Sequence, residues 1–219
     1  MKFNFAVLLI ISLWFVFACT DPSQSSKAKE KGTGVLEFYE NTDREIWQRP
    51  ELVQSLFGDL TNKTVADIGA GSGFFTFRLA ERAEKVIAIE INQEVVDKLN
   101  ASIPEAVKDR VEVRLVPPDN PMLQPEEVDA ILIVNTYVYF DDRVEYLKKL
   151  HKSLSEIGRV LISDFKKKQT PLGPPPEFRL SLYEVEKELQ EAGFRIIVSD
   201  DTSLGYQYVV LAEKVEPQQ

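Results

Sequence analysis

From Thr64 onward, short apolar runs alternate with amphipathic stretches, a pattern typical of strands and helices that succeed one another along a parallel sheet. The apolar runs predict seven strands: Thr64–Ile68, Lys85–Ile89, Val111–Leu115, Val128–Val134, Arg159–Asp164, Arg195–Ser199 and Tyr206–Ala212. Apolar positions three and four residues apart predict helices over Phe74–Arg82, Gln93–Ser102, Arg143–Ser153 and Ser181–Ala192. Gly193 follows the last helix and is expected to end it.

No segment of helical length separates the last two predicted strands, so they are expected to pair antiparallel through a loop that contains Gly205. Between Asn41 and Leu60 the apolar residues fit a helical face that is interrupted at Pro50, which predicts two short helices with Pro50 at the start of the second. The predicted fold is α/β: a Rossmann-like, seven-stranded, mostly parallel sheet with an antiparallel C-terminal strand and helices on both faces.

The first eighteen residues differ from the rest, because Phe5 to Ala18 are apolar except for Ser12 and lead directly into Cys19. This run is shorter than the roughly 20 residues of a membrane-spanning helix, and it predicts a signal peptide over residues 1–18. The alternative is an uncleaved N-terminal anchor. Residues 19–40 begin with Cys19 and continue as a polar, flexible tether, and residues 41–215 form the predicted domain.

This N-terminus resembles the lipobox of bacterial lipoproteins. The resemblance implies that Cys19 is the lipidated first residue of the mature chain. It also implies a location in the bacterial cell envelope, anchored to a membrane and facing the periplasm. Both the lipid anchor and the uncleaved signal anchor make a membrane one of the expected partners.

Composition and net charge limit which other classes of partner are expected. The net charge is −9 and the only basic run is Lys166–Lys168, so nucleic acid is not expected as the main partner. The chain has one cysteine and one histidine, Cys19 and His151, so no zinc-type cluster and no metal is predicted. These properties favour a small-molecule substrate.

Candidate chemistry begins at the turn Gly69-Ala-Gly-Ser-Gly73, which follows a strand and opens a helix. Main-chain N–H groups and the helix dipole face whatever binds there, although such turns also serve structural purposes. The third glycine comes one residue earlier than in the dehydrogenase pattern Gly-x-Gly-x-x-Gly. Glu90 ends the next strand, where its carboxylate can accept hydrogen bonds from both ribose hydroxyls.

Three segments, Val65 to Phe77, Val86 to Ile91 and Val128 to Asn135, resemble motifs of class I S-adenosylmethionine-dependent methyltransferases. The resemblance implies S-adenosylmethionine as cofactor, with Asp67 orienting its amino group and Glu90 holding its ribose. Asp119 stands where an acid often contacts the adenine, but a turn formed by Asp119 and Asn120 explains that residue equally well. The implied cofactor-binding residues are Asp67, Gly69, Ala70, Gly71, Gly73, Glu90, Ile91, Asp119 and Asn135.

A narrower resemblance is to exported bacterial methyltransferase-like proteins. It rests on Trp47-Gln48-Arg49-Pro50, on Gly173-Pro-Pro-Pro with Arg179-Leu-Ser181, and on Gln207-Tyr208. That group typically has Asp-Thr-Tyr-His-His after the fourth strand, where this chain has Asn135-Thr-Tyr-Val-Tyr139.

The methyl acceptor is expected beyond the ends of the fourth and fifth strands, which makes Asn135, Tyr137, Tyr139 and Asp164 the candidate catalytic residues. Asn135 is expected to accept a hydrogen bond from the methyl acceptor. Packing at the sheet edge is the alternative for the tyrosines, and a turn cap is the alternative for Asp164. Arg179 is expected to pair either with an acidic substrate or with a surface carboxylate, and His151 to lie on a helix face at the core edge.

The sequence therefore predicts a methyltransferase that modifies an unidentified small molecule. The alternative is a catalytically inactive lipoprotein of the same fold that binds a ligand or acts as a scaffold.

Overall fold

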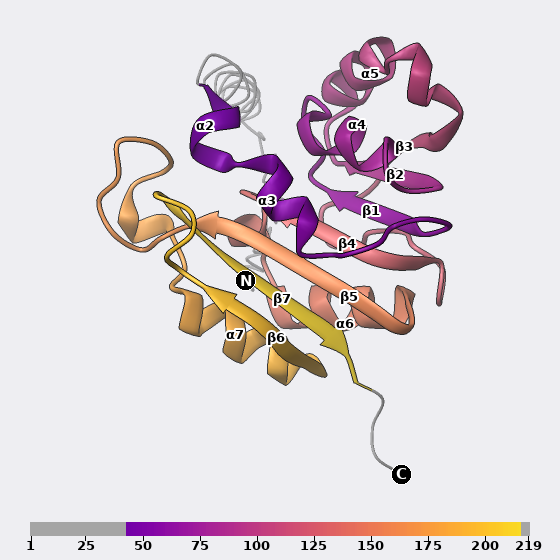
Figure 1. The fold of residues 1–219 in the computed structure, drawn as a ribbon. Helices are drawn as coiled ribbons and strands as arrows, with labels where there is room; N and C mark the ends of the chain where they lie inside the picture. Colours follow the sequence, from indigo (N-terminus) through magenta and orange to yellow (C-terminus); the bar gives the residue numbers. More distant parts are fainter. Residues whose placement is uncertain (1–42, 216–219) are drawn as a thin grey trace, which may run out of the picture. The chain divides into compact units, whose positions relative to one another are not determined.

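The computed structural model describes residues 43–215, which belong to one compact unit of the chain. The predicted signal peptide, Cys19 and the whole predicted tether lie outside the described residues. Seven strands form one sheet in the order β3-β2-β1-β4-β5-β7-β6 (Figure 1). Their bounds are β1 Thr64–Ile68, β2 Lys85–Glu90, β3 Val111–Leu115, β4 Val128–Val134, β5 Leu154–Phe165, β6 Phe194–Asp200 and β7 Gln207–Lys214.

The strand directions confirm the predicted topology. Strand β1 pairs in parallel with β2 and β4, and the parallel pairing continues to β3 and β5. Strand β7 lies between β5 and β6 and runs antiparallel to both. The carboxyl ends of β1, β2, β4 and β5 consequently meet at one edge of the sheet, where ligands bind in folds of this kind.

Helices cover both faces of the sheet (Figure 1). Apolar residues of α6 (Arg143–Ser153) and α7 (Leu182–Glu191) pack on one face, and those of α3 (Pro50–Ser55) and α4 (Phe74–Ala80) pack on the other. Leu99 of α5 (Gln93–Ser102) packs against Ala88 of β2. The described residues also form short 3-10 helices, which are η1 (Glu105–Arg110), η2 (Tyr137–Tyr139) and η3 (Pro176–Phe178). Within residues 43–215, no helix is both long enough and apolar enough to span a membrane.

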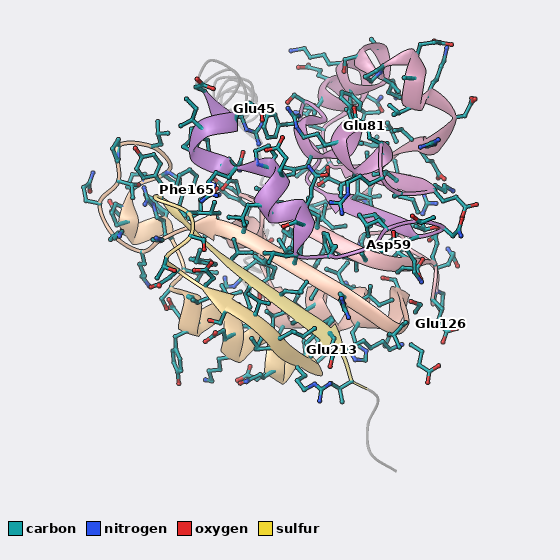
Figure 2. All side chains as sticks on the ribbon, in the orientation of Figure 1. Glu45, Asp59, Glu81, Glu126, Phe165 and Glu213 are labelled. Carbon is teal, nitrogen blue, oxygen red and sulfur yellow. The ribbon has the colours of Figure 1, made fainter. Side chains whose placement is uncertain are left out.

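Two short helices form the cap that the sequence predicted before the sheet. Helix α2 spans Arg44–Gln48, and Pro50 begins α3 because a proline needs no N–H partner in a first helical turn. Phe165 lies at the end of β5 (Figure 2). Trp47 of α2 stacks on it, with ring centroids 5.6 Å apart. Arg49 Nη1 donates to Ser203 O at 3.1 Å, which fastens the cap to the loop between β6 and β7.

The largest difference from the predicted boundaries is at the start of β5, and the ends of several other elements differ by one or two residues. Strand β5 begins at Leu154 rather than Arg159, because buried Leu154 pairs with Val128 directly after α6 ends. Helix α7 begins at Leu182, and Ser181 is its N-cap, accepting from Glu184 N while the Glu184 carboxylate accepts from Ser181 N.

Candidate functional site

The glycine turn connects β1 to α4 at the carboxyl edge of the sheet. Gly69 N and Ala70 N both donate to Ile89 O, at 2.9 and 3.2 Å, which ties the turn to β2. Gly69 has φ +76°, and a Cβ at this position would lie 2.4 Å from Thr136 Oγ1. Only glycine therefore permits this close approach of the turn to the segment that follows β4.

Glu90 holds the same turn from the end of β2. Its carboxylate accepts from Gly71 N at 2.9 Å and from Ile91 N at 3.0 Å. Each carboxylate oxygen keeps a further lone pair, so these bonds leave room for donors such as ribose hydroxyls. Ile91 is 61% exposed beside this carboxylate, an apolar surface that a planar ring of a ligand would cover.

Asp67 lies under the turn and is 3% exposed. Its Oδ2 accepts from Thr76 Oγ1 of α4 at 2.6 Å. Burial raises the pKa of Asp67 to about 6, with the Thr76 hydrogen bond acting to lower it and the nearby Glu90 carboxylate acting to raise it. A cationic amino group near Asp67 would stabilise the ionised carboxylate, so this residue fits the amino end of S-adenosylmethionine.

For Gly73 and Asp119, two other residues predicted to bind the cofactor, the fold offers a purely structural explanation. A Cβ at Gly73 would lie within 2.7 Å of Phe77 and Leu99, so Gly73 allows helix α4 to pack closely and need not touch a ligand. Asp119 is exposed in a turn in which Asn120 N donates to Pro117 O at 3.2 Å. The turn that the sequence allowed is present, and contact of Asp119 with an adenine stays a prediction.

Asn135 follows β4 in a left-handed conformation, with φ 55°. Its N–H donates to Ser163 O at 3.0 Å, and its Oδ1 accepts from Gln207 Nε2 of β7 at 2.6 Å. The side-chain oxygen that was expected to meet the methyl acceptor is therefore held by Gln207. Sequence reasoning gave Gln207 no role, although it noted the Gln207-Tyr208 pair.

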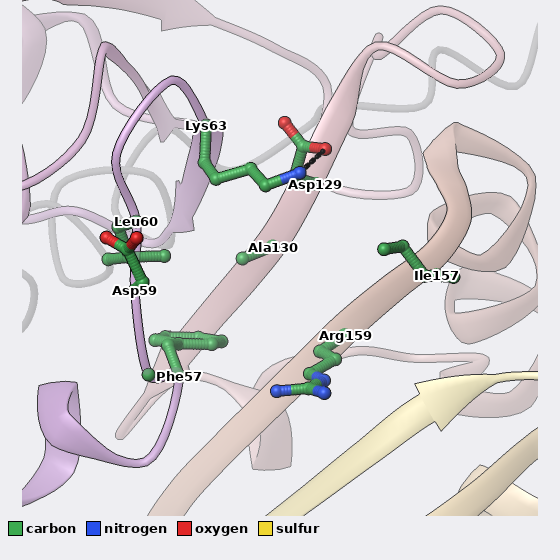
Figure 3. Close-up of a pocket in the computed structure, with 9 residues that line it drawn as sticks. Phe57, Asp59, Leu60, Lys63, Asp129, Ala130, Ile157 and Arg159 are labelled. Carbon is green, nitrogen blue, oxygen red and sulfur yellow. Dashed lines mark hydrogen bonds and ion pairs between the residues drawn. The ribbon is translucent and has the colours of Figure 1, made fainter.

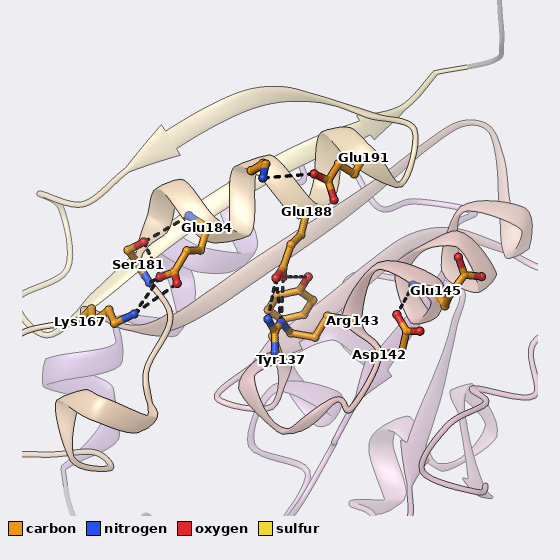
Figure 4. A network of polar contacts seen from close by, with 10 residues as sticks. Tyr137, Asp142, Arg143, Glu145, Lys167, Ser181, Glu184, Glu188 and Glu191 are labelled. Carbon is orange, nitrogen blue, oxygen red and sulfur yellow. Dashed lines mark hydrogen bonds and ion pairs between the residues drawn. The ribbon is translucent and has the colours of Figure 1, made fainter.

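Tyr137 does not line a site at the sheet edge. It is 0% exposed, and its hydroxyl donates to Glu188 Oε2 of α7 at 2.7 Å (Figure 4). Arg143 of α6 also donates to Glu188, at 2.7 to 3.1 Å. Burial raises the pKa of Tyr137 well above its usual value, so its phenol stays protonated at neutral pH. The catalytic assignment of Tyr137 is corrected to the alternative, core packing, with a polar link between η2, α6 and α7.

Tyr139 and Asp164 remain candidates near the expected methyl acceptor. Tyr139 is 63% exposed, whereas Asp164 is 5% exposed at the end of β5. Asp164 Oδ1 accepts from Phe165 N at 2.8 Å, and Oδ2 has no hydrogen-bond partner within residues 43–215. Burial raises the pKa of Asp164 to about 7, which is suitable for exchanging a proton near neutral pH.

The buried Arg179 side chain donates to oxygen atoms of the loop that follows β5. It is 3% exposed and donates to the carbonyl oxygens of Lys166, Lys168, Leu172 and Pro174 and to Thr170 Oγ1, at 2.6 to 3.1 Å. Its role is to hold the loop between β5 and η3. His151 lies at the edge of α6, as predicted, with Nε2 3.2 Å from Val215 O.

A separate pocket of about 230 Å³ lies at the opposite edge of the sheet, near the amino ends of β1 and β4 (Figure 3). Lys63 and Asp129 form an ion pair of 3.2 Å there, and Arg159 of β5 also lines the pocket. None of the predicted site residues lies in it. Within residues 43–215, no cluster of three or more histidine, cysteine or acidic residues has a metal-binding arrangement.

The comparisons with known proteins agree with this fold. Residues 66–162 match a family model described as a methyltransferase domain. A crystal structure of an S-adenosylmethionine-dependent methyltransferase from Aquifex aeolicus is 27% identical with a TM-score of 0.76, and the match covers 89% of this chain and 99% of that one.

Two curated relatives match over shorter stretches. An uncharacterized methyltransferase of Mycobacterium tuberculosis is 30% identical over 99 residues, which are 45% of this chain and 35% of that protein. A ribosomal RNA small subunit methyltransferase of Salinibacter ruber is 38% identical over 60 residues, which are 26% of this chain and 20% of that protein. The matches thus span about a third or less of these relatives. Residues 66–162 are thus similar to a methyltransferase domain, and the sheet of residues 43–215 has the fold of class I, S-adenosylmethionine-dependent methyltransferases.

Proposed function

We propose that this chain is an S-adenosylmethionine-dependent methyltransferase that modifies a small molecule. The observation that carries the proposal is the double hydrogen bond of Glu90 to Gly71 N and Ile91 N, which holds the glycine turn beside a free carboxylate face. The similarity to the Aquifex aeolicus methyltransferase supports the predicted cofactor.

Different residues at the carboxyl edge of the sheet would bind different parts of the cofactor. Asp67 and the turn around Gly69 would hold the amino-acid end of the cofactor, and Glu90 with Ile91 would hold the ribose and one face of the base. When bound, S-adenosylmethionine supplies an electrophilic methyl group on a sulfonium. Alignment of a nucleophile with that group is the main requirement of methyl transfer.

Asp164 is the side chain proposed to take up a proton from the methyl acceptor. It lies at the end of β5 with one oxygen unpartnered within residues 43–215, and its pKa of about 7 lets it alternate between charged and neutral forms. Tyr139 is exposed above the same strand end and is proposed to cover the methyl acceptor.

The net charge of −9 favours a small molecule over a nucleic acid as methyl acceptor, although one curated relative is named as a ribosomal RNA methyltransferase. The second candidate, an inactive ligand-binding protein of this fold, rests on the predicted export and on the replaced histidines after β4. It predicts cofactor binding without turnover.

Calorimetric titration with S-adenosylmethionine, S-adenosylhomocysteine and NAD tests the proposal. We expect both S-adenosyl compounds to bind and NAD not to bind. Glu90→Ala removes the ribose acceptor and the two backbone contacts, so we expect at least about a hundredfold weaker binding, since hydrogen bonds to a charged group contribute about 1.5 to 3 kcal/mol each. Glu105→Ala, at a side chain 89% exposed, is the matched control and should bind normally. Preference for NAD, or unchanged binding by Glu90→Ala, would contradict the proposal.

A further inference from the structure

Buried polar groups without partners gather where the cap meets the carboxyl ends of β4 and β5. Within residues 43–215, Gln48 Nε2, Ser163 Oγ and Gln207 Oε1 have no hydrogen-bond partner, and all three side chains are 0% exposed. Gln207 pairs with Phe165 across the sheet, and Phe165 stacks on Trp47, the neighbour of Gln48. Because buried polar groups in proteins are normally hydrogen-bonded, a cluster of exceptions indicates a place prepared for a polar ligand.

The side-chain amides of Asn135 and Gln207 define what this ligand must offer. One hydrogen bond of 2.6 Å joins Gln207 Nε2 to Asn135 Oδ1, which leaves the amino group of Asn135 and the oxygen of Gln207. If both amides were turned over, the remaining groups would again be one amino group and one carbonyl oxygen. In either arrangement the pair presents a donor and an acceptor side by side.

Gln48 adds a second donor. Its Oε1 accepts from Arg44 Nε at 2.8 Å, and a guanidinium can only donate. This fixes the orientation of the amide, so the group left over is Nε2, which is an N–H donor.

Among the described residues, the guanidinium groups of Arg44 and Arg179 next to the cluster already have hydrogen-bond partners. Arg44 Nε is bonded to Gln48, and Arg179 is occupied by the loop between β5 and η3. Asp164 alternates with Ser163 along β5 and leaves the strand on the other face, so it would meet the acceptor only beyond the end of the strand. A bound anion would compete with these existing hydrogen bonds for the two guanidinium groups, so much of its desolvation would be uncompensated.

We propose that Asn135, Gln207 and Gln48 recognise the methyl acceptor, and that this acceptor is a neutral molecule with an adjacent hydrogen-bond acceptor and donor, such as a carboxamide or a lactam. Gln207 is then a specificity-determining residue. The inference rests on the proposed function. Since the groups are buried, the acceptor reaches them when the cap helices α2 and α3 move away from β5 and β7.

Benzamide and benzoate are a suitable pair of probes, because they have the same shape and differ in charge and in the amide donor. The full chain, labelled with ¹⁵N and saturated with S-adenosylhomocysteine, is titrated with each probe while the side-chain amide signals of Gln48, Asn135 and Gln207 are followed by NMR. We expect benzamide to shift these signals and to bind at least about tenfold more tightly than benzoate, a difference of about 1.4 kcal/mol.

Variants then assign the effect to the cluster. Gln207→Leu should abolish the preference for benzamide, and Gln48→Leu should weaken it, whereas Gln190→Leu on the exposed face of α7 should leave it unchanged. Retained binding of S-adenosylhomocysteine shows that each variant is folded. Equal or tighter binding of benzoate, or no binding of either probe by the loaded wild-type protein, would overturn the inference. Failure of S-adenosylhomocysteine itself to bind would instead overturn the proposed function.

Discussion

At the scale of single residues, the contact between Gly69 and Thr136 joins the two halves of the site, because it presses the cofactor turn against the segment that carries Asn135. A side chain at Gly69 would therefore disturb both halves. Gly58 provides a control for the effect of backbone strain alone. It has the same φ of +76°, but a Cβ there would have nothing within 4 Å.

We predict that Gly69→Ala destabilises the protein by about 1 to 3 kcal/mol more than Gly58→Ala, which is the usual cost of overpacking. Gly58→Ala alone should cost about 1 to 2 kcal/mol, from the left-handed conformation. Urea denaturation of both variants measures the difference, and equal losses would show that the contact with Thr136 is not tight.

A second prediction concerns Asp164. Burial raises its pKa to about 7 from the ordinary value of 3.8, so the folded protein holds this proton more tightly than the unfolded chain. Its contribution to stability is fully present below pH about 4 and is lost as the pH rises through about 7.

Asp164→Asn removes this titration. The free energy of unfolding of the wild type, minus that of Asp164→Asn, should therefore fall by a few kcal/mol at most between about pH 4 and about pH 8. Taking the difference cancels groups that both proteins share, including Asp67. Denaturation curves at several pH values test this, and a difference independent of pH would contradict it.

Single residues also show how far the sequence predicted the site. The sequence predicted that Asp67, Gly69 and Glu90 lie together, because a turn between a strand and a helix has a fixed geometry, while their contact with a cofactor stays a prediction. The burial of Tyr137 was not predicted, because a side chain three residues after the end of a strand can turn to either face of the sheet. That choice depends on Glu188, which is 51 residues away in the sequence.

At the scale of elements, the loop between β5 and η3 depends on one side chain. Arg179 donates to five oxygen atoms of this loop and is itself buried. No carboxylate takes part in these bonds, so the arginine acts as a clamp on the backbone. Its planar guanidinium has five N–H groups in fixed directions, a geometry that lysine lacks.

We predict that Arg179→Lys destabilises the protein by roughly 2 to 4 kcal/mol, since several hydrogen bonds to a charged group are lost. Cleavage by trypsin after Lys166–Lys168 should become faster as the loop loosens. Arg195→Lys is the control, because the Arg195 side chain is 73% exposed and its pairing with Glu213 is on the surface. Wild-type stability and cleavage rate in Arg179→Lys would refute the clamp.

The bounds of helices and strands were predicted well where a single local sequence signal determines where the element begins or ends. Pro50 marked the start of α3, and α6 has the predicted bounds. The start of β5 was predicted too late, because residues 154–158 have a mixed polar pattern and become a strand by pairing next to β4. Tertiary pairing of this kind leaves little periodicity in the sequence.

At the scale of the whole molecule, the sheet could be predicted because alternating strands and helices admit few topologies. The acceptor side could not, since it depends on residues distant in sequence. Asn135 and Gln207, for example, are 72 positions apart. Only the finished sheet brings their amides together.

Localisation also belongs to this scale, and it stays a prediction. If Cys19 is lipidated, mass spectrometry of the membrane fraction should give a chain that begins at Cys19 and carries acyl groups. Cys19→Ser should move the protein to the soluble fraction or leave the signal peptide in place. An unmodified Cys19 in an intact N-terminus would refute lipidation.

The position of β7 between β5 and β6 bears on how this protein is synthesised. Buried residues of β7, among them Tyr208, Val209 and Leu211, complete the core on both faces of the sheet. A nascent chain that has emerged from the ribosome only as far as β6 has no neighbour with which that strand can pair. Completion of the sheet therefore waits for β7, the last strand within the described residues.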